Sequence, residues 1–349
     1  MTTSSFLMVT CQVGAEPALK GELARRWPEL RFSYSRPGFL TFKLPPEYGL
    51  ADDFDLESVF ARAYAFSLGK ATGETDDERA ASVWQLAEGR PFNALHVWPR
   101  DAFAPGVRKF EPGMTPESLN VERLARAAAP EEVGSALRAK PQAEMGDLVL
   151  DCVVVGTNEW WIGFHRARSL ASQWPGGMLD LKLPADAVSR AWLKMEEGLR
   201  WADLPLARGD QAAELGCAPG GSCQALLARG LRVMGVDPAE VEPLVLSHPR
   251  FTHVRKRGSD MKRREFREVK WLFADMNVAP AYTLDTVEAI ATHEAVHIQG
   301  LVLTLKLLEW TLAADVPDYL ARIRSWGFPQ VQARQLQHNR QEICVVARR

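Results

Sequence analysis

A glycine-rich turn at residues 214–221, ELGCAPGG, is the stretch of the sequence that most clearly predicts chemistry. A short apolar run ends at this turn, a helix and a second strand should follow, and Asp237 closes the unit. This order is typical of a nucleotide-type cofactor site, because glycines let the backbone approach a ligand and a helix N-terminus favours an anionic group. An aspartate at the end of the second strand would accept hydrogen bonds from both ribose hydroxyls of the cofactor.

The spacing of the glycines excludes two common phosphate-binding loops. Gly216, Gly220 and Gly221 do not form G-x-G-x-x-G, and Pro219 removes a backbone donor. No G-K-[ST] follows, so the turn is not a P-loop. A Gly-Pro turn in an unrelated α/β protein stays open as an alternative.

The pattern acidic-x-Gly-x-x-Pro-Gly-Gly resembles the first motif of FtsJ-like methyltransferases, which bind S-adenosyl-L-methionine. The turn and the residues that match the family elsewhere give the expected cofactor-binding set: Ser189, Glu214, Gly216, Ala218, Pro219, Gly220, Gly221, Asp237, Asp260 and Asp275.

FtsJ-like 2'-O-methyltransferases also carry a Lys-Asp-Lys-Glu tetrad, which Lys194, Asp275, Lys306 and Glu342 match in the same order. A ribose 2'-hydroxyl must lose its proton to attack the sulfonium methyl, so the site needs a general base and alignment. We expect Lys306 to be this base, with a pKa lowered by burial and by the like charge of Lys194. Asp275 and Glu342 would fix both ammonium groups. Taken singly, each lysine could be a solvated strand or helix end.

Longer stretches make the resemblance closer. LDLKLPADAVSRAWLKMEEG, VMGVD, FADM, LTLKL and QARQLQHNRQEICVVARR are similar to the bacterial ribosomal RNA large-subunit methyltransferase M family, and VTCQVGAEPALKGELARR, VFARAYAF and EWWIGFHRA match it more weakly. The resemblance implies an N-terminal RNA-binding region with a THUMP domain. It also implies 2'-O-methylation of one cytidine of 23S rRNA, as mature RNA or large-subunit precursor.

One departure from this family concerns the adenine of the cofactor. The family has an acidic residue near the adenine, where the ungapped position here is Arg257. Either a small gap in the alignment with the family places Asp260 at the position of this acidic residue, or the adenine is contacted in a different way. The usual aromatic residue after Pro-Gly-Gly is Ser222.

A basic stretch follows the third strand of the expected cofactor domain. Residues 250–270 hold nine lysines and arginines against three acidic residues, which suits contact with RNA phosphates or a solvated face. Further basic residues could continue a path from the linker to the active site: Arg166, Arg168, Lys182, Arg190 and Lys194. Trp160 or Trp161 could stack on a base, although packing is the alternative for both.

The sequence HEAVH fits the H-E-x-x-H pattern of zinc proteases, with His293, Glu294 and His297 expected on one helix. The pattern fixes only three positions, and no good third ligand follows it. We therefore predict no metal site.

The order of apolar and polar residues predicts the helices and strands that position these side chains, and it differs between the two halves of the chain. The N-terminal part is typical of an α+β unit, with strands near 6–12, 31–34 and 38–43, helices at 16–26 and 54–63, and a hairpin around GTNE in residues 147–167. The C-terminal part alternates strands near 211–216, 231–236, 251–255, 270–275, 299–305, 329–335 and 341–347 with helices near 188–199, 220–229, 283–297 and 316–326.

The predicted fold is therefore α/β: a Rossmann-like class I methyltransferase domain, doubly wound and mostly parallel with an antiparallel edge hairpin, after an α+β THUMP-containing region. The expected domains are a ferredoxin-like subdomain at 1–70, a THUMP-like domain at 71–168, a linker at 169–188 and the FtsJ-like domain at 189–349.

Composition sets the outer limits of this interpretation. The 349 residues carry a net charge of −2, and the five cysteines are widely scattered, so no disulfide framework or cysteine zinc site is indicated. No signal peptide or membrane span is expected, so a cytoplasmic location is the default. The expected oligomeric state is a monomer or weak dimer. Two alternatives stay open: a methyltransferase with a non-RNA substrate, and a non-catalytic RNA-binding or ribosome-assembly protein on a methyltransferase fold.

Overall fold

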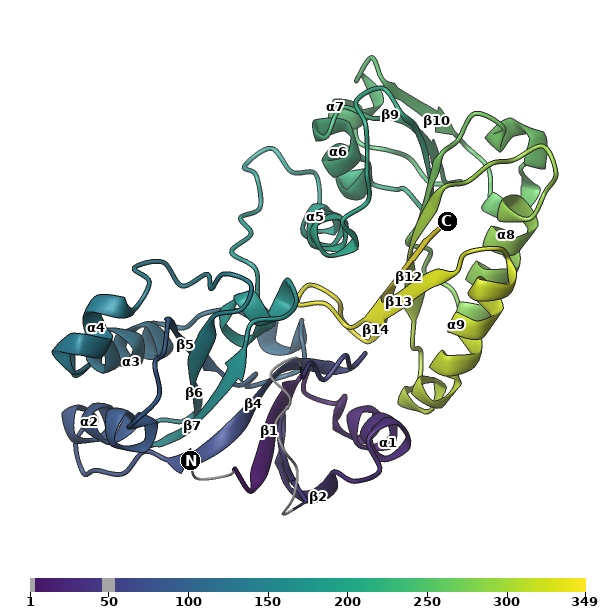
Figure 1. The fold of residues 1–349 in the computed structure, drawn as a ribbon. Coiled ribbons are helices and arrows are strands. Elements are labelled where there is room, and N and C mark those ends of the chain that lie inside the picture. Colours follow the sequence, from purple (N-terminus) through teal and green to yellow (C-terminus); the bar gives the residue numbers. More distant parts are fainter. Residues whose placement is uncertain (1–3, 46–53) are drawn as a thin grey trace. The chain divides into compact units, whose positions relative to one another are not determined.

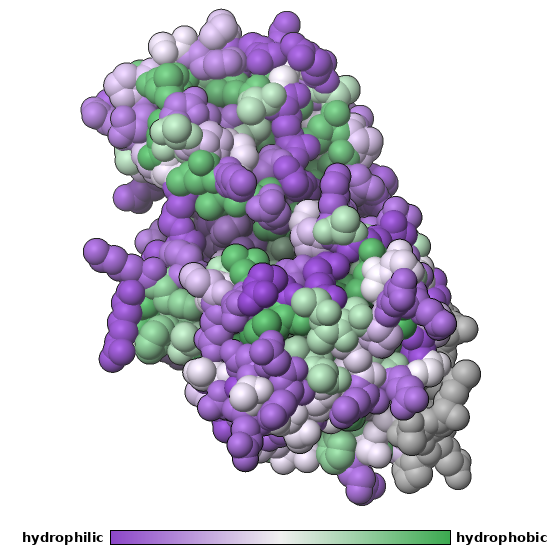
Figure 2. Space-filling model, turned by 90° about the vertical axis from the view of Figure 1, so that its left-hand side faces the viewer, coloured by the Kyte–Doolittle hydropathy of each residue, from purple (hydrophilic) through white to green (hydrophobic). Residues whose placement is uncertain are grey.

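The structure, a computed structural model, describes residues 4–45 and 54–349. The chain divides into two compact units, Met1–Leu179 and Asp180–Arg349 (Figure 1). Among the described residues, no helix has both the length and the apolar character needed to cross a membrane. Hydrophilic side chains cover much of the face drawn in Figure 2, with hydrophobic ones in smaller groups between them.

The first unit is built on a seven-stranded sheet in the order β2-β3-β1-β4-β7-β6-β5. Neighbouring strands are antiparallel except β5 and β6, which are parallel. The strands are β1 (Phe6–Cys11), β2 (Arg31–Arg36), β3 (Phe39–Lys43), β4 (Ala61–Lys70), β5 (Ala94–Pro99), β6 (Leu148–Gly156) and β7 (Glu159–Arg166). The helices are α1 (Glu16–Arg26), α2 (Asp76–Ala87), α3 (Pro116–Ala127) and α4 (Glu131–Ala136), with short 3-10 turns η1 (Val107–Lys109), η2 (Ala171–Gln173) and η3 (Pro175–Gly177).

Successive side chains of β5 and β6 point to opposite faces of this sheet. On one face, Leu95 and Leu150 pack against α2 and α3 in a hydrophobic core. On the other face, Trp98 and Val153 contact Met178, which follows η3. Both faces of these strands are therefore buried.

One predicted helix of this unit is wrong. Residues 54–63 do not form a helix, and the chain instead enters β4 at Ala61. This strand lies between β1 and β7 and forms ladder hydrogen bonds with both, which outweighs the local helix preference of its alanine and arginine residues. The predicted hairpin is confirmed, because β6 and β7 pair across a turn at residues 157–158. Residues 1–70 and 71–168 share one sheet, and their division into two domains stays a prediction.

The second unit confirms the predicted doubly wound sheet. Its strand order is β10-β9-β8-β11-β12-β14-β13. The strands from β10 to β12 in this order are parallel, and β14 runs antiparallel to both β12 and β13. The strands are β8 (Gln211–Leu215), β9 (Arg232–Val236), β10 (Phe251–Val254), β11 (Trp271–Ala274), β12 (Gly300–Lys306), β13 (Gln330–Arg334) and β14 (Glu342–Arg348). The helices are α5 (Ala191–Ala202), α6 (Gly221–Ala228), α7 (Pro243–Leu246), α8 (Pro280–Ala291) and α9 (Val316–Ser325), with 3-10 turns η4 (Gly258–Asp260), η5 (Arg263–Phe266) and η6 (Trp310–Asp315).

Helices cover both faces of this sheet, with α5 and α6 on one side and α8 and α9 on the other (Figure 1). Leu199 of α5 and Leu226 of α6 belong to the core that packs against Phe273 and Val302 of the central strands. The chain winds from β8 outward to β9 and β10, then returns to β11 and β12 on the other side of β8. The carboxyl ends of β8 and β11 therefore flank the switch point at which open α/β sheets bind ligands.

The predicted end of α8 is wrong. The helix ends at Ala291 and not at 297, because the chain must turn back to begin β12 at Gly300. His293 lies in the turn that follows, where its ring nitrogen accepts a hydrogen bond from the backbone N–H of Ala295 at 3.1 Å. The histidines of HEAVH therefore do not share a helix face, as a zinc protease would require.

Candidate functional site

The glycine turn lies directly after β8, at the switch point of the second sheet. Gly216 has a φ of +82°, and a Cβ there would lie 2.6 Å from the backbone carbonyl oxygen of Asp275. Gly221 begins α6, and a Cβ at this position would collide with Ser189. The turn thus needs glycines for close backbone approach, and it brings Ser189 and Asp275 beside the N-terminus of α6.

Asp237 follows β9 and lies half-buried against the same turn. Its carboxylate accepts hydrogen bonds from the backbone N–H of Ala218 at 3.1 Å and of Ala239 at 2.8 Å. These contacts orient the carboxylate while leaving acceptor capacity for ribose hydroxyls, since each oxygen offers two lone pairs.

A cavity of about 410 Å³ opens beside Asp237 and falls within the size range of small-molecule sites. The residues that line it come from the ends of β8, β9 and β11, from the segment between β10 and η4, and from the start of α8: Gly216, Val236, Asp237, Pro238, Arg257, Gly258, Met276, Asn277, Val278 and Tyr282. The lining therefore offers a carboxylate and apolar side chains of the kind that suit a nucleoside, and Asp237 as the residue that holds the ribose stays a prediction.

Asp260 is exposed in η4 and is not among the residues that line this cavity, whereas Arg257 is. Gly258, two residues before Asp260, lies close to Thr286 and Leu215. Contact between Asp260 and the adenine stays a prediction. Of the two expectations for the adenine, contact by other groups is the one that the cavity supports.

Glu214 lies beneath the turn in β8 and is fully buried. The thiol of Cys223 donates a hydrogen bond to its Oε2 at 2.8 Å. Loss of solvation raises the pKa of Glu214 to about 7, although the hydrogen bonds from Cys223 and Ser222 oppose this change. Glu214 therefore supports the turn from below and does not line the described cavity.

The structure brings the four residues of the predicted tetrad together at one edge of the sheet. Lys194 Nζ lies 2.6 Å from Asp275 Oδ2 and 2.7 Å from Glu342 Oε1. Lys306 Nζ lies 2.9 Å from Asp275 Oδ1 and also contacts Glu342 Oε2. We call this closed arrangement, in which each ammonium group contacts both carboxylates, the four-charge ring.

Each member of the ring comes from a different element. Lys194 is in α5, Asp275 follows β11, and Lys306 ends β12 directly opposite Glu342, which begins β14. The three side chains of Lys194, Asp275 and Lys306 keep 15–18% of their surface exposed, so the ring faces solvent on one side. A small cavity of about 20 Å³ beside the ring is lined by Lys194, Asp275 and also Ser222 of α6, the helix that begins at the glycine turn. This cavity therefore lies between the ring and the glycine turn.

The predicted lowering of the Lys306 pKa is wrong for the protein without ligands. Burial acts to lower this pKa, but Asp275 and Glu342 outweigh burial and raise it well above its usual value. The reciprocal effect holds the pKa of Asp275 and Glu342 below their usual values despite burial. All four members of the ring are therefore charged, and their charges sum to zero. Lys306 carries a proton in this state.

Two residues that support the ring carried no clear signal in the sequence. Glu197 is buried in α5 and accepts hydrogen bonds from the backbone N–H groups of Gln337 at 2.8 Å and His338 at 2.9 Å. Asn339 donates to Glu342 Oε1 at 3.3 Å. Glu197 therefore holds the loop between β13 and β14 against α5, and Asn339 connects this loop to Glu342. The density of polar residues in QHNRQE was the only hint of these roles.

The basic stretch 250–270 is exposed at several positions after β10, including Lys256, Arg257 and Arg264. Arg255 and Lys270 instead form ion pairs, with Glu240 at 3.6 Å and Asp210 at 2.7 Å. In the first unit Trp160 is fully buried, so it cannot stack on a base, and Trp161 is half-buried under Lys70.

Comparison with known proteins agrees with this geometry. Residues 187–315 match the FtsJ-like methyltransferase family. Because of this match, we call the segment the FtsJ-like domain. The match and the names of the relatives confirm the predicted methyltransferase class and its cofactor, S-adenosylmethionine, whereas the roles of the turn, Asp237 and the four-charge ring stay predictions.

Similarity extends beyond the FtsJ-like domain. A protein named Ribosomal RNA large subunit methyltransferase M from Tolumonas auensis is 25% identical over 98% of this chain and 95% of its own length. A protein of the same name from Xanthomonas campestris pv. campestris is 28% identical over 99% of both chains. The solved structure of TrmN from Thermus thermophilus covers 99% of both chains with 15% identity and a TM-score of 0.37. The predicted resemblance to the methyltransferase M family is confirmed over the full chain.

Proposed function

We propose that this protein transfers a methyl group from S-adenosylmethionine to a ribose 2'-hydroxyl of large-subunit ribosomal RNA. The observation that carries the proposal is the four-charge ring beside the cofactor turn. A methyltransferase acting on an already nucleophilic atom needs no such set, whereas a hydroxyl needs a proton acceptor and exact placement. The names of the full-length relatives support RNA as the substrate.

The residues of the chain divide the work between binding and proton transfer. Asp237 would hold the ribose of the cofactor, and the N-terminus of α6 would face its carboxylate. Bound there, the cofactor supplies a sulfonium methyl group that is already activated for displacement. Lys194, Asp275 and Glu342 would position Lys306 against the substrate hydroxyl.

Lys306 is the proposed proton acceptor, and it must first release its own proton. Asp275 and Glu342 raise its pKa, so the neutral fraction is small at pH 7 and grows as the pH rises. The neutral amine would then take the 2'-hydroxyl proton while the oxygen–methyl bond forms and the sulfur–methyl bond breaks. The transfer rate is therefore expected to increase with pH into the alkaline range.

The first unit would bind structured RNA and present the target to the FtsJ-like domain. We propose it as the THUMP-containing region, with domains at 1–70 and 71–168 and a linker at 169–188. A cytidine as target, a cytoplasmic location and a monomer or weak dimer belong to the same proposal. The exposed residues Lys256, Arg257 and Arg264 would add phosphate contacts in the FtsJ-like domain.

The test combines cofactor binding with mapping of methylated riboses. Purified protein is titrated calorimetrically with S-adenosylmethionine, then incubated with ribosomal RNA from cells that lack this protein, and 2'-O-methyl groups are mapped by mass spectrometry. We expect one new 2'-O-methyl group, and loss of cofactor binding in Asp237→Ala. Cofactor binding without any methylated ribose would favour a non-RNA substrate, and absence of cofactor binding would favour a non-catalytic RNA-binding protein.

A further inference from the structure

The second buried set of charged groups lies in the first unit, far along the sequence from the methyltransferase machinery. His96 of β5, Asp151 of β6 and His165 of β7 lie on three adjacent strands. Within residues 4–45 and 54–349, these three side chains form a group whose possible metal-ligand atoms all lie within 4.8 Å of one another. We propose that they form a binding site for a divalent transition-metal ion of the zinc type.

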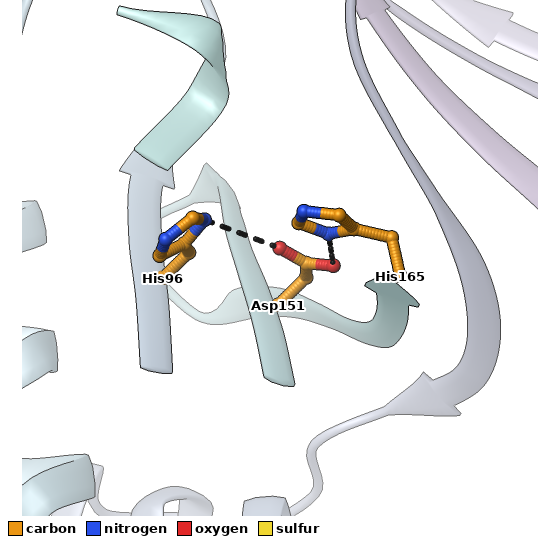
Figure 3. Close-up of side chains that lie close together, drawn as sticks. All are labelled: His96, Asp151 and His165. Atoms are coloured by element: carbon orange, nitrogen blue, oxygen red, sulfur yellow. Dashed lines mark hydrogen bonds and ion pairs between the residues drawn. The ribbon is translucent and has the colours of Figure 1, made fainter. Parts of the chain in front are cut away.

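Strand register puts the three side chains on one face of the sheet. His96 is directly paired with Asp151 in the parallel ladder, and His165 is paired with Val149, two residues before Asp151. Residues two apart in a strand point to the same side. In Figure 3 the two imidazole rings flank the carboxylate, each with a nitrogen toward one of its oxygens.

One half of the cluster lacks partners although it is buried. His96 and Asp151 have no exposed surface, and within the described residues neither ring nitrogen of His96 nor Asp151 Oδ1 has a hydrogen-bond partner by distance and angle. His96 Nδ1 and Asp151 Oδ1 lie 3.9 Å apart, too far for a direct hydrogen bond. Buried polar atoms normally have a partner, so this gap calls for a bridging species.

The gap has nearly the width that a metal ion requires. Two ligands at about 2.0–2.1 Å from a tetrahedral zinc ion lie about 3.3 Å apart, so a small side-chain rotation would close 3.9 Å to this value. His165 Nδ1 is 2.6 Å from Asp151 Oδ2, and would move outward to become the third ligand. Two imidazoles and one carboxylate form a donor set that suits zinc and its first-row neighbours.

Backbone carbonyl groups support both imidazole rings from outside the cluster. His165 Nε2 lies 2.8 Å from the carbonyl oxygen of Ser172 in η2. The backbone carbonyl of Pro141 lies near His96, although the contact does not meet strict hydrogen-bond geometry. A metal-bound histidine usually donates its second N–H to such a carbonyl, which fixes the ring orientation.

The absence of exposed surface at His96 and Asp151 points to a structural role. An ion here would join β5, β6 and β7 and would hold the segment with Ser172 against the sheet through His165. The covering residues on this face include Met178, which packs against Trp98 and Val153. The inference does not depend on the proposed methyltransferase function, because all of these residues belong to the first unit.

The test uses the full-length chain without a histidine tag, incubated with excess Zn²⁺ and then freed of loosely bound metal by gel filtration. Elemental analysis should find one zinc per chain in the wild type. His96→Gln should weaken zinc affinity by at least about 100-fold. His297→Gln, which alters the exposed HEAVH sequence, is the matched control and should keep the zinc.

A spectroscopic measurement covers the case in which His96→Gln does not fold. X-ray absorption of the zinc-loaded wild type should show nitrogen and oxygen ligands, including imidazole, and no sulfur. A wild type that retains no zinc would overturn the proposal and leave a bridging water in the gap. Zinc that survives in His96→Gln, disappears in His297→Gln or is bound through sulfur would overturn it as well.

Discussion

The two units each bury a cluster of opposite charges in a sheet, but at different places. The four-charge ring lies where strands end, and most of its side chains keep 15–18% of their surface exposed. The cluster of His96, Asp151 and His165 lies within the strands, and its carboxylate has no exposed surface. A charge cluster at the carboxyl ends of strands lies where open α/β sheets bind ligands, whereas we expect a fully buried carboxylate between strands to affect mainly stability. Removing a charge from each should therefore produce different losses.

The largest effect is expected from Lys306→Met. The variant keeps the length of the side chain but removes the proposed proton acceptor, so the methyl-transfer rate should fall by about 10²–10⁴-fold. Single-turnover transfer to ribosomal RNA measures this loss, and calorimetry should show unchanged affinity for S-adenosylmethionine. Lys270→Met is the matched control, because it removes a lysine paired with a carboxylate at the opposite end of β11. A transfer rate within tenfold of the wild type would exclude Lys306 as the base.

In the first unit, Asp151→Asn should reduce stability and leave the FtsJ-like domain intact. Removing one partner from a buried ion pair typically costs about 3–5 kcal/mol. Hydrogen exchange, with a chelator present, should show faster exchange in β5, β6 and β7 and unchanged exchange in β8–β14. Asp77→Asn, at an exposed position in the first turn of α2, should have little effect. Equal acceleration in both units would mean that the cluster does not act locally.

The sequence predicted the second unit better than the first for a physical reason. Strands of a parallel sheet are continuous apolar runs separated by helices, so β8, β9, β11 and β12 stand out without knowledge of their partners. The strand β4 does not, because Ala61–Lys70 becomes a strand only through pairing with β1 and β7. The helix expected at 54–63 failed for this reason.

The candidate site was also only partly predictable from the sequence. The motif resemblance found the members of the ring, because each follows or begins an apolar strand or lies in the adjacent helix. It could not give the direction of the Lys306 pKa, which depends on two carboxylates converging from Asp275 and Glu342. The cluster in the first unit went unnoticed, since His96, Asp151 and His165 have no short-range spacing that indicates a site.

Glu214 tests whether burial alone, without a cation partner, is enough to change stability. Its pKa is raised from 4.5 to about 7, so the folded state binds a proton that the unfolded state releases. Stability should therefore be fully present below pH 4.5 and decrease as the pH rises through 7, by up to about 3 kcal/mol. Denaturation between pH 5 and pH 8 measures this slope, which Glu214→Gln should flatten. The exposed control Glu240→Gln should retain it. A slope that persists in Glu214→Gln would assign the proton to another group.

The smallest effect is expected at charges that remain in solvent. Lys256 and Arg264 are exposed in the basic stretch, so each would gain a phosphate contact only when RNA binds. Replacing both by alanine should reduce the slope of log affinity against log salt by about 1.4, since each contact with single-stranded RNA contributes about 0.7. Filter binding over a range of salt concentrations measures the slope. Arg200→Ala is the control, because its charge is already paired with Glu196 at 2.9 Å, and it should leave the slope unchanged. An equal slope in all three proteins would show that this stretch is a solvated face, and RNA contact would then depend on the first unit and the four-charge ring.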